Sequence, residues 1–267
     1  MRKTLALCVV LLLGLMTTAA MASTFVNGGF ENGNLTGWTQ GGGYWSSGWP
    51  LDPSSYLPSG SQYSPSYMTN TIVTPGLDPL TGGHLNEVYS GNYAVRVNDS
   101  NNNYSVSVIS QTVNNYTDPN IYFAWAAVLE GSHGPTDSDN FTLQLMDVTK
   151  SIALYNVTWD SADASTANLF ADHKDLSGND WYYTSWQVEN LDVSAYQGDT
   201  FTLSLLGSDC PYGGHAGYVY LDGFGNVLPP PSSPSNVPEP SSFVLLGSGA
   251  AFLVTTVRAK LARRHAA

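Results

Sequence analysis

The chain has 267 residues, of which 42% are hydrophobic and only 11% charged, and its formal net charge is −12. Between residues 23 and 236 three basic residues stand against twenty carboxylates, so this part is far more acidic than the whole. Such a surface repels nucleic acid and anionic lipid headgroups and excludes both as its partners, whereas divalent cations and neutral polymers such as polysaccharide are compatible with it. Only Cys210 follows the N-terminal segment, so a hydrophobic core and not an intramolecular disulfide must stabilise the fold.

The N-terminus has the three parts of a secretory signal peptide. Arg2 and Lys3 form a basic start, residues 5–16 are apolar, and Ala20 and Ala22 flank Met21 in a small-residue cleavage site. We expect residues 1–22 to be removed, which makes the mature protein an exported one. A permanent N-terminal anchor is the alternative.

Residues 23–227 are predicted to form one all-β domain. Valine, isoleucine, threonine and aromatic residues are abundant, turn residues separate short runs, and no stretch keeps a helical period. The predicted strands cover residues 91–97, 104–113, 121–129, 141–146, 152–159, 181–188, 200–206 and 217–222. Residues 141–146 and 152–159 are expected to pair as a hairpin, and residues 160–180 to form a loop. With an opening strand this makes about nine strands, which is typical of a two-sheet jelly roll.

The opening stretch, residues 25–38, reads Phe-Val-Asn-Gly-Gly-Phe-Glu-Asn-Gly-Asn-Leu-Thr-Gly-Trp. It resembles the N-terminal strand of galactose-binding-like jelly-roll domains, which include many carbohydrate-binding modules. The resemblance implies that Phe25 and Phe30 anchor the first strand and that Trp38 packs across the opening of the sandwich. It also implies that Glu31, which follows Phe30, binds a structural Ca²⁺.

Residues 41–85 are rich in glycine, serine, proline and tyrosine and are predicted to be a long loop insertion. Trp45, Trp49 and Tyr56 lie in it. Their rings are candidates for stacking on sugar, which would make them ligand-binding residues. The alternative is that these rings fix an irregular loop to the sandwich.

A second cluster of polar and ligating residues ends the domain, in the pattern Asp-Cys-x-x-Gly-Gly-His-x-Gly-Tyr-x-Tyr-x-Asp from Asp209 to Asp222. The pattern resembles a recurring ending of exported bacterial β-sandwich domains, for which no chemistry is established. One interpretation places Asp222 beside Glu31 at the structural Ca²⁺ site, because the first and last strands of such sandwiches lie together and hard oxygen ligands suit calcium.

Two further interpretations concern His215. In one, Asp209 and His215 bind a transition metal, together with His133 and Asp139 from another loop. In the other, the two glycines before His215 make a tight turn, and the imidazole only forms hydrogen bonds within it. The thiol of Cys210 is expected to be buried and inert.

No recognisable catalytic motif is present. The chain lacks a nucleophile elbow, a His-Glu-x-x-His zinc motif and a phosphate-binding glycine loop. We therefore assign no catalytic residue. A catalytic pair of glycosidase carboxylates cannot be inferred either, because among twenty carboxylates some two are expected to lie close together by chance.

The C-terminus has the form of a sorting signal. Residues 228–236 are a proline- and serine-rich linker, and Pro238, Glu239 and Pro240 follow it. An uncharged run at residues 243–257 then leads into a basic tail of Arg258, Lys260, Arg263 and Arg264. The run is shorter than a transmembrane helix, which needs about 20 residues. If the helix extends over about 241–259, its length comes close to this requirement. An ordinary tail anchor or a buried apolar helix is the alternative.

This arrangement in residues 237–267 resembles the PEP-CTERM signal of bacterial exported proteins. The resemblance implies an exosortase as a processing partner, a transmembrane helix held in the inner membrane before processing, and a final place at the cell surface, outer envelope or extracellular matrix. We expect a non-catalytic adhesive or polysaccharide-associated protein, as in exopolysaccharide or biofilm matrices. A carbohydrate-active enzyme and a purely structural coat component are the alternatives.

Overall fold

The computed structural model describes residues 24–45, 49–131, 133–227 and 230–231. The predicted signal peptide with Ala20 and Ala22, the Pro238–Pro240 motif, the C-terminal helix and the basic tail lie outside the described residues. Among the described residues, none of the helices has the length and apolar character that a bilayer crossing requires.

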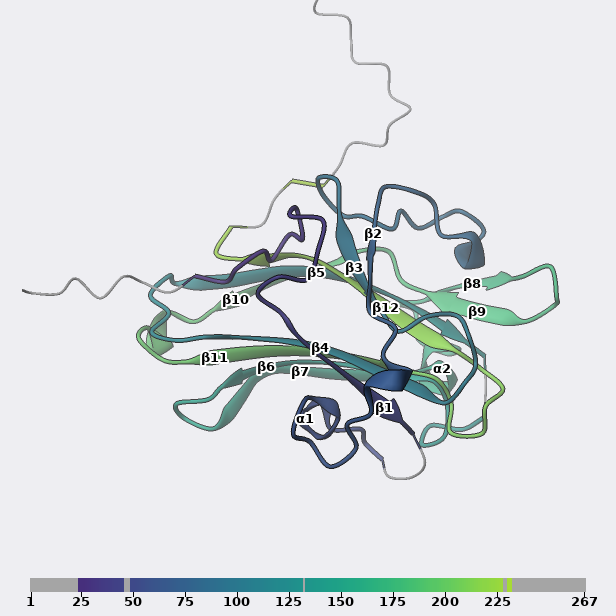
Figure 1. Cartoon of the computed structure of the whole chain (residues 1–267). Helices are drawn as coiled ribbons and strands as arrows, with labels where there is room; N and C mark the ends of the chain where they lie inside the picture. Colours follow the sequence, from purple (N-terminus) through teal and green to yellow (C-terminus); the bar gives the residue numbers. More distant parts are fainter. Residues whose placement is uncertain (1–23, 46–48, 132, 228–229, 232–267) are drawn as a thin grey trace, which may run out of the picture.

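Two antiparallel sheets are stacked face to face (Figure 1). The five-stranded sheet contains, from edge to edge, β1 (Thr39–Tyr44), β4 (Ser105–Val113), β11 (Phe201–Ser208), β6 (Asn140–Asp147) and β7 (Ile152–Asp160). The seven-stranded sheet contains β2 (Thr71–Val73), β3 (Ala94–Val97), β12 (Gly217–Gly225), β5 (Asn120–Glu130), β9 (Asp180–Tyr183) and β8 (Ala171–Lys174), with β10 (Gln187–Asp192) paired to β5. The expected all-β, two-sheet sandwich is confirmed.

The core lies between the sheets because alternate side chains of each strand point inward. Ile109, Phe141 and Leu205 face it from one sheet, Phe123 and Leu221 from the other, and all five are fully buried. Strand β5, which contains the predicted strand of residues 121–129, is buried along almost its whole length. Its second face packs against the aromatic side chains of β9 and β12.

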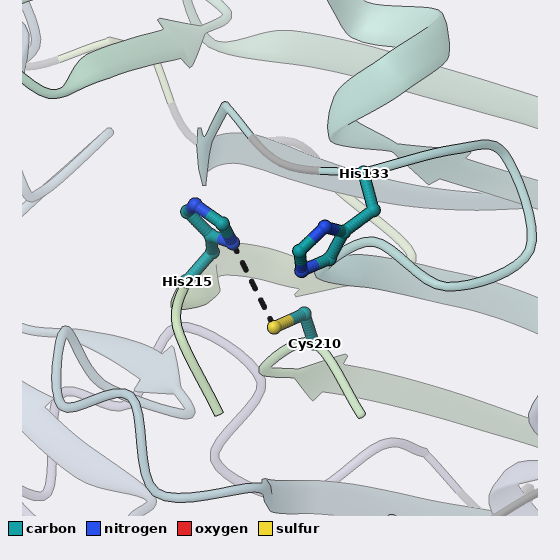
Figure 2. A group of neighbouring side chains, drawn as sticks. All are labelled: His133, Cys210 and His215. Atoms are coloured by element: carbon teal, nitrogen blue, oxygen red, sulfur yellow. Dashed lines mark hydrogen bonds between the residues drawn. The ribbon is translucent and has the colours of Figure 1, made fainter. Parts of the chain in front are cut away.

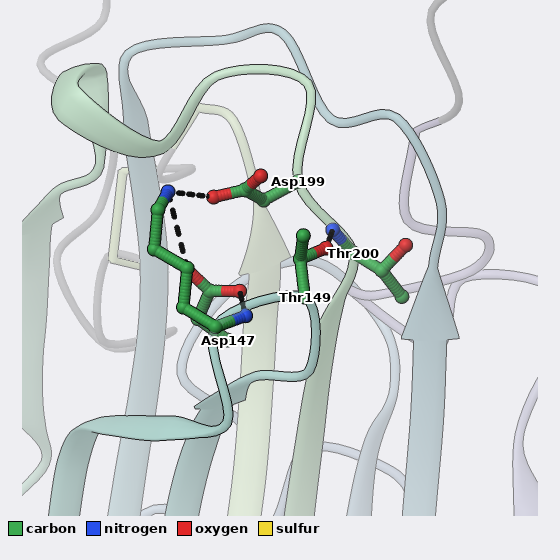
Figure 3. A network of polar contacts seen from close by, with 5 residues as sticks. Asp147, Thr149, Asp199 and Thr200 are labelled. Carbon is green, nitrogen blue, oxygen red and sulfur yellow. Dashed lines mark hydrogen bonds and ion pairs between the residues drawn. The ribbon is translucent and has the colours of Figure 1, made fainter.

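The predicted hairpin of residues 141–146 and 152–159 is confirmed, as β6 and β7 pair from Asn140 opposite Asp160 to Asp147 opposite Ile152. Its turn is held to the start of β11 by the polar contacts of Figure 3. The Lys150 ammonium pairs with Asp199 and lies 3.7 Å from Asp147, and the Thr200 N–H donates to the Thr149 hydroxyl at 2.9 Å.

The opening stretch differs from the expectation. Residues 25–38 form turns and no strand, since Asn27, Phe30 and Gly33 have positive φ angles of 53°, 55° and 65°, which an extended chain does not allow. The expected packing is nevertheless present: Trp38 is 7% exposed and stacks on Phe30 with 5.2 Å between ring centroids.

The predicted loop insertion at residues 41–85 is largely structured. Its start belongs to β1, and it also contains α1 (Pro53–Tyr56), η1 (Pro65–Tyr67), β2 and η2 (Pro79–Thr81). The glycines that suggested a loop are needed for close packing on a strand. A Cβ at Gly41 would lie 2.3 Å from the Tyr56 carbonyl oxygen, and one at Gly43 would lie 2.2 Å from that of Gln62.

Residues 160–188 also differ from the expectation. The predicted loop contains α2 (Ser161–Ala164) and β8, whose mostly exposed side chains have no apolar pattern. The single strand predicted at 181–188 is two, β9 and β10, separated at Thr184, which exchanges hydrogen bonds with the backbone of Ala127 on β5. A short η3 (Ser194–Tyr196) follows β10.

Candidate functional site

Glu31 and Asp222 lie at the same end of the sandwich and share one loop as their hydrogen-bond donor. The Glu31 carboxylate accepts from the N–H groups of Asn92 and Tyr93 at 3.0–3.2 Å. Asp222 Oδ2 accepts from the N–H groups of Tyr89 and Ser90 at 3.1 and 2.9 Å. The N–H groups of one short loop, residues 89–93, therefore donate hydrogen bonds to both carboxylates.

The pair has the charge and the ligand chemistry that Ca²⁺ requires. A Cβ on Gly29 would lie within 3.9 Å of both side chains, so the two carboxylates are close neighbours. Burial, together with the charge of Glu31, raises the pKa of Asp222 to about 7. Asp222 Oδ1 accepts only from the Gly223 N–H at 2.6 Å and keeps a lone pair for a cation, whereas Asp222 Oδ2 and both Glu31 oxygens already accept two hydrogen bonds each. The two residues are of the type that binds Ca²⁺, and a calcium ion at this place stays a prediction.

Asp209 is not beside His215 but inside the sandwich. Its Oδ1 accepts from the side-chain amide of Asn98 at 2.8 Å, and its Oδ2 accepts from the N–H groups of Asn103 and Ser105, both at 2.9 Å. Burial raises its pKa to about 7. The carboxylate thus fixes the chain before β4, and this arrangement does not support its predicted role as a metal ligand.

His215 has Cys210 and His133 as its neighbours instead (Figure 2). Cys210 Sγ lies 3.8 Å from His215 Nδ1, and the two imidazole rings are 4.9 Å apart between centroids. Asp139, the fourth residue of the predicted set, is fully buried, and its Oδ1 accepts a hydrogen bond from the Ser161 hydroxyl at 2.8 Å. His133 and His215 were predicted as ligands, whereas the Cys210 thiol was predicted to be inert. The spacing of Cys210 five residues before His215, with a Gly-Gly turn between them, was a signal that the two side chains could lie together.

The three aromatic candidates of the insertion have different exposures. Trp45 and Tyr56 are 1% and 3% exposed and pack on Val106, Val108 and Leu206 of the five-stranded sheet. Burial leaves no ring face for a sugar, so their geometry is that of residues fixing the insertion to the sheet. Trp49 is partly exposed and stacks on Trp45 with 6.1 Å between centroids.

A row of polar side chains crosses the outer face of the five-stranded sheet. The strand registers align one residue from each strand: Thr39, Ser110, Ser204, Gln144 and Asn156. The two serine hydroxyls are 2.9 Å apart and nearly buried, whereas Gln144 is half-buried and Asn156 exposed. The amides of this row are therefore accessible to a ligand.

Helix α1 makes one part of this row, Ser204, Gln144 and Asn156, a wall of a groove. Two cavities of about 160 and 290 Å³ lie between α1 and the sheet, and both are lined by Pro53 and Gln144. We call them together the sheet groove; its other lining residues are Pro50, Leu51, Asp52, Ser54, Leu57, Thr142, Met146, Val148, Ser151, Asn156, Thr158, Thr202 and Ser204. Figure 1 shows α1 on the side of this sheet that faces away from the other sheet.

The sheet groove carries almost no charge. None of these lining residues is basic, and its one carboxylate, Asp52, accepts hydrogen bonds from the Ser54 N–H and from the hydroxyls of Ser54 and Ser55. Sequence analysis missed this site, because ordinary serine, threonine and amide residues on separate strands form a row only once the strand registers are known.

The comparisons with known proteins concern the fold alone. No protein-family profile and no curated protein matches the chain. Among solved structures, TmCBM61 in complex with β-1,4-galactotriose is 13% identical over 75% of this chain and 95% of that one, with a TM-score of 0.36. A carbohydrate-binding module specific for non-crystalline cellulose, CBM28, is 15% identical over 74% and 92%, with a TM-score of 0.36. CBM27-1 of Caldicellulosiruptor saccharolyticus, solved with mannohexaose, is 11% identical over 61% and 84%, with a TM-score of 0.32. These similarities are too low to assign a ligand to this chain.

Proposed function

We propose that this protein is a non-catalytic polysaccharide-binding component of the bacterial surface or extracellular matrix, and that the sheet groove is its binding site. The observation that carries the proposal is the uncharged row of hydroxyl and amide groups beside the apolar side chains of Pro50, Leu57 and Met146. The low similarity to carbohydrate-binding modules agrees with this proposal but does not carry it.

The composition of the groove matches the surface of a neutral sugar chain. A sugar ring presents hydroxyl groups that donate and accept hydrogen bonds, and C–H faces that are apolar. Gln144 and Asn156 supply both donors and acceptors, while Pro50, Leu57 and Met146, none of them fully buried, supply apolar contacts. An anionic polymer would find no cation there, so the proposed ligand is an uncharged polysaccharide.

Export and sorting belong to the same proposal and rest on the sequence patterns of the two ends. An exosortase would recognise the Pro238–Pro240 motif with the apolar run and basic tail that follow it. Replacement of Pro238, Glu239 and Pro240 by alanine is expected to keep the protein in the membrane fraction, whereas the parent reaches the surface or medium. Equal distribution of the two proteins after cell fractionation would contradict this step.

The binding proposal is tested by a glycan array probed with the full-length chain. We expect binding to neutral polysaccharides, lowered about three- to tenfold by Gln144→Ala and by Asn156→Ala, since each change removes hydrogen bonds of about 0.5–1.5 kcal/mol. Gln187→Ala and Asn190→Ala are matched controls on β10 of the other sheet and should bind like the parent.

Two results would overturn the proposal. An array without binding would favour a structural coat component. Release of reducing sugar from a bound glycan, abolished by the change of one carboxylate, would identify an enzyme.

A further inference from the structure

Three metal-ligating side chains meet at one end of the sandwich, away from the sheet groove and from the Glu31–Asp222 pair. The ligand atoms of His133, Cys210 and His215 all lie within 4.8 Å of one another. Figure 2 shows the two imidazoles and the thiol directed toward a common space.

The backbone builds this cluster from two connections. Cys210 and His215 stand on either side of the tight turn between β11 and β12, where the Cys210 N–H donates to the His215 carbonyl at 3.0 Å. Gly213, in the turn, has a φ angle of +72°. His133 comes from the connection between β5 and β6, and its ring contacts that of Tyr212 in the same turn with 5.0 Å between centroids.

The spacing of the Cys210 and His215 ligand atoms is close to that of a tetrahedral metal site. With Zn–S near 2.3 Å and Zn–N near 2.0 Å, a thiolate sulfur and an imidazole nitrogen on one zinc ion are about 3.6 Å apart. Cys210 Sγ and His215 Nδ1 are 3.8 Å apart. Small side-chain movements would bring His133, which is exposed, to the same distance.

We propose that His133, Cys210 and His215 bind a divalent transition metal of the zinc type. One thiolate and two imidazoles are a borderline-soft donor set, which selects zinc-like ions over Ca²⁺ and Mg²⁺. The side chain of Cys210 is 0% exposed, and this burial favours a thiolate held on a metal ion over a nucleophile that has to meet an incoming substrate.

A neighbouring carboxylate supports a cation at this place. Asp139 is fully buried and within electrostatic range of Cys210, and its Oδ2 has no hydrogen-bond partner. An ionised carboxylate oxygen that is buried without a donor is costly, so burial raises the pKa of Asp139 unless a positive charge is near. A metal ion held by the adjacent thiolate supplies that charge.

The site would keep one coordination position open. His133 and His215 both line a polar cavity of about 460 Å³, whose wall also includes Glu130, Asp180 and Tyr182. Three protein ligands beside a polar cavity leave the fourth position of a tetrahedral ion to water or to an oxygen ligand from the cavity. This arrangement is distinct from a closed structural site with four protein ligands.

Cobalt(II) spectroscopy of the metal-free, reduced full-length chain tests the proposal. We expect one equivalent of Co²⁺ to produce a thiolate-to-cobalt charge-transfer band and intense visible bands of tetrahedral cobalt, both removed by Zn²⁺. His133→Ala and His215→Ala should weaken metal binding at least about tenfold, and Cys210→Ser should remove the charge-transfer band.

Matched variants separate this site from others. His173→Ala, on β8, and Glu31→Gln, at the predicted calcium site, should bind Co²⁺ like the parent. Because Cys210 is buried, Cys210→Ser can fail to fold; the exposed His133 then provides the decisive variant. Absence of the charge-transfer band in the parent, or an unchanged titration in both His133→Ala and His215→Ala, would overturn the proposal.

Discussion

The outer faces of the two sheets are both covered by the insertion, but in opposite ways. On the five-stranded sheet the apolar residues Trp45, Leu51 and Tyr56 cover one part, and the remaining part is the open sheet groove. On the seven-stranded sheet residues 74–89 close the face around a buried carboxylate. Asp78 Oδ2 accepts from the hydroxyls of Tyr218 and Tyr220 at 2.7 and 2.8 Å.

The difference lies in where polar groups find their partners. On the seven-stranded sheet the buried hydroxyls are satisfied within the protein, and the Arg96 guanidinium lies over the Tyr218 ring at 5.4 Å. On the five-stranded sheet Gln144 and Asn156 have only a long contact of 3.5 Å with each other, so their amides retain capacity for an outside ligand. One face thus contributes stability, and the other is suited to binding.

The largest expected effect comes from opening the closed face. Asp78→Ala leaves the buried Tyr218 hydroxyl without an acceptor and the Tyr220 hydroxyl with only a 3.4 Å contact to Glu87. It should lower the free energy of unfolding by about 3–4 kcal/mol in denaturant titrations. Asp52→Ala, at the N-terminus of α1 beside the groove, removes a helix cap and should cost only about 1 kcal/mol. In the Tyr218→Phe/Tyr220→Phe variant, Asp78→Ala should lower the free energy of unfolding by less than it does in the parent. An equal loss in both would show that the hydroxyl contacts of Asp78 do not stabilise this face.

Loosening the cover of the five-stranded sheet should cost less and affect binding as well. Leu51→Ala removes a side chain that is 5% exposed and should lower the free energy of unfolding by about 2–3 kcal/mol. Because Leu51 also lines the groove, glycan binding should weaken while the circular dichroism of the sheets persists. Leu176→Ala is the control, since that leucine is fully exposed. Unaltered glycan affinity in Leu51→Ala would show that the groove is not the binding site.

The predicted calcium site should have a smaller, pH-dependent effect. At about ten times its Kd, Ca²⁺ adds about 1.4 kcal/mol to the free energy of unfolding, and a chelator removes this gain. The gain should be larger at pH 8 than at pH 5.5, because the buried Asp222 has its pKa raised to about 7 and is protonated at the lower pH. Without Ca²⁺, Asp222 alone makes the free energy of unfolding fall as pH rises from 3.8 to about 7, since the folded chain binds the extra proton.

Thermal unfolding with and without chelator measures this effect. Glu31→Gln and Asp222→Asn should each abolish the response to Ca²⁺, whereas Asp192→Asn, an exposed carboxylate on β10, should keep it. A parent protein whose Tm does not respond to chelator has no such site.

The smallest expected effect is an absence of change. Glycan affinity should stay constant when salt is raised, because no charged pair between groove and ligand is there to be screened. Affinity electrophoresis at low and high ionic strength measures this. A steep loss of affinity with salt would indicate a charged ligand and a site other than the sheet groove.

The sequence predicted those features that depend on local pattern. The alternation of β4, β6 and β11 identified strands within a few residues. Glu31 was expected beside Asp222 because the first and last strands of such sandwiches lie together; the stretch around Glu31 forms turns instead, and the calcium site stays a prediction. Exposed β8 lacked an apolar pattern, and the glycines of β1 suggested a loop, so both strands were missed. Their positions are set by tertiary pairing, which overrides local preference.

The candidate sites show the same limit. His133 and His215 were recognised by residue type, whereas the burial of Trp45 and Tyr56 depends on how the insertion folds back on the sheet. The polar row from Thr39 to Asn156 joins five strands whose members lie between positions 39 and 204 of the sequence, and it has no local signature. Only strand register places its members side by side.

The most direct test of the central claim is a crystal structure of the protein with the oligosaccharide that binds best on the array. We predict that the sugar lies along the outer face of the five-stranded sheet, with Gln144 and Asn156 hydrogen-bonded to its hydroxyls and the exposed Pro50 against a ring face. A sugar bound to the seven-stranded sheet or in the cavity beside His133, with the sheet groove empty, would contradict the account.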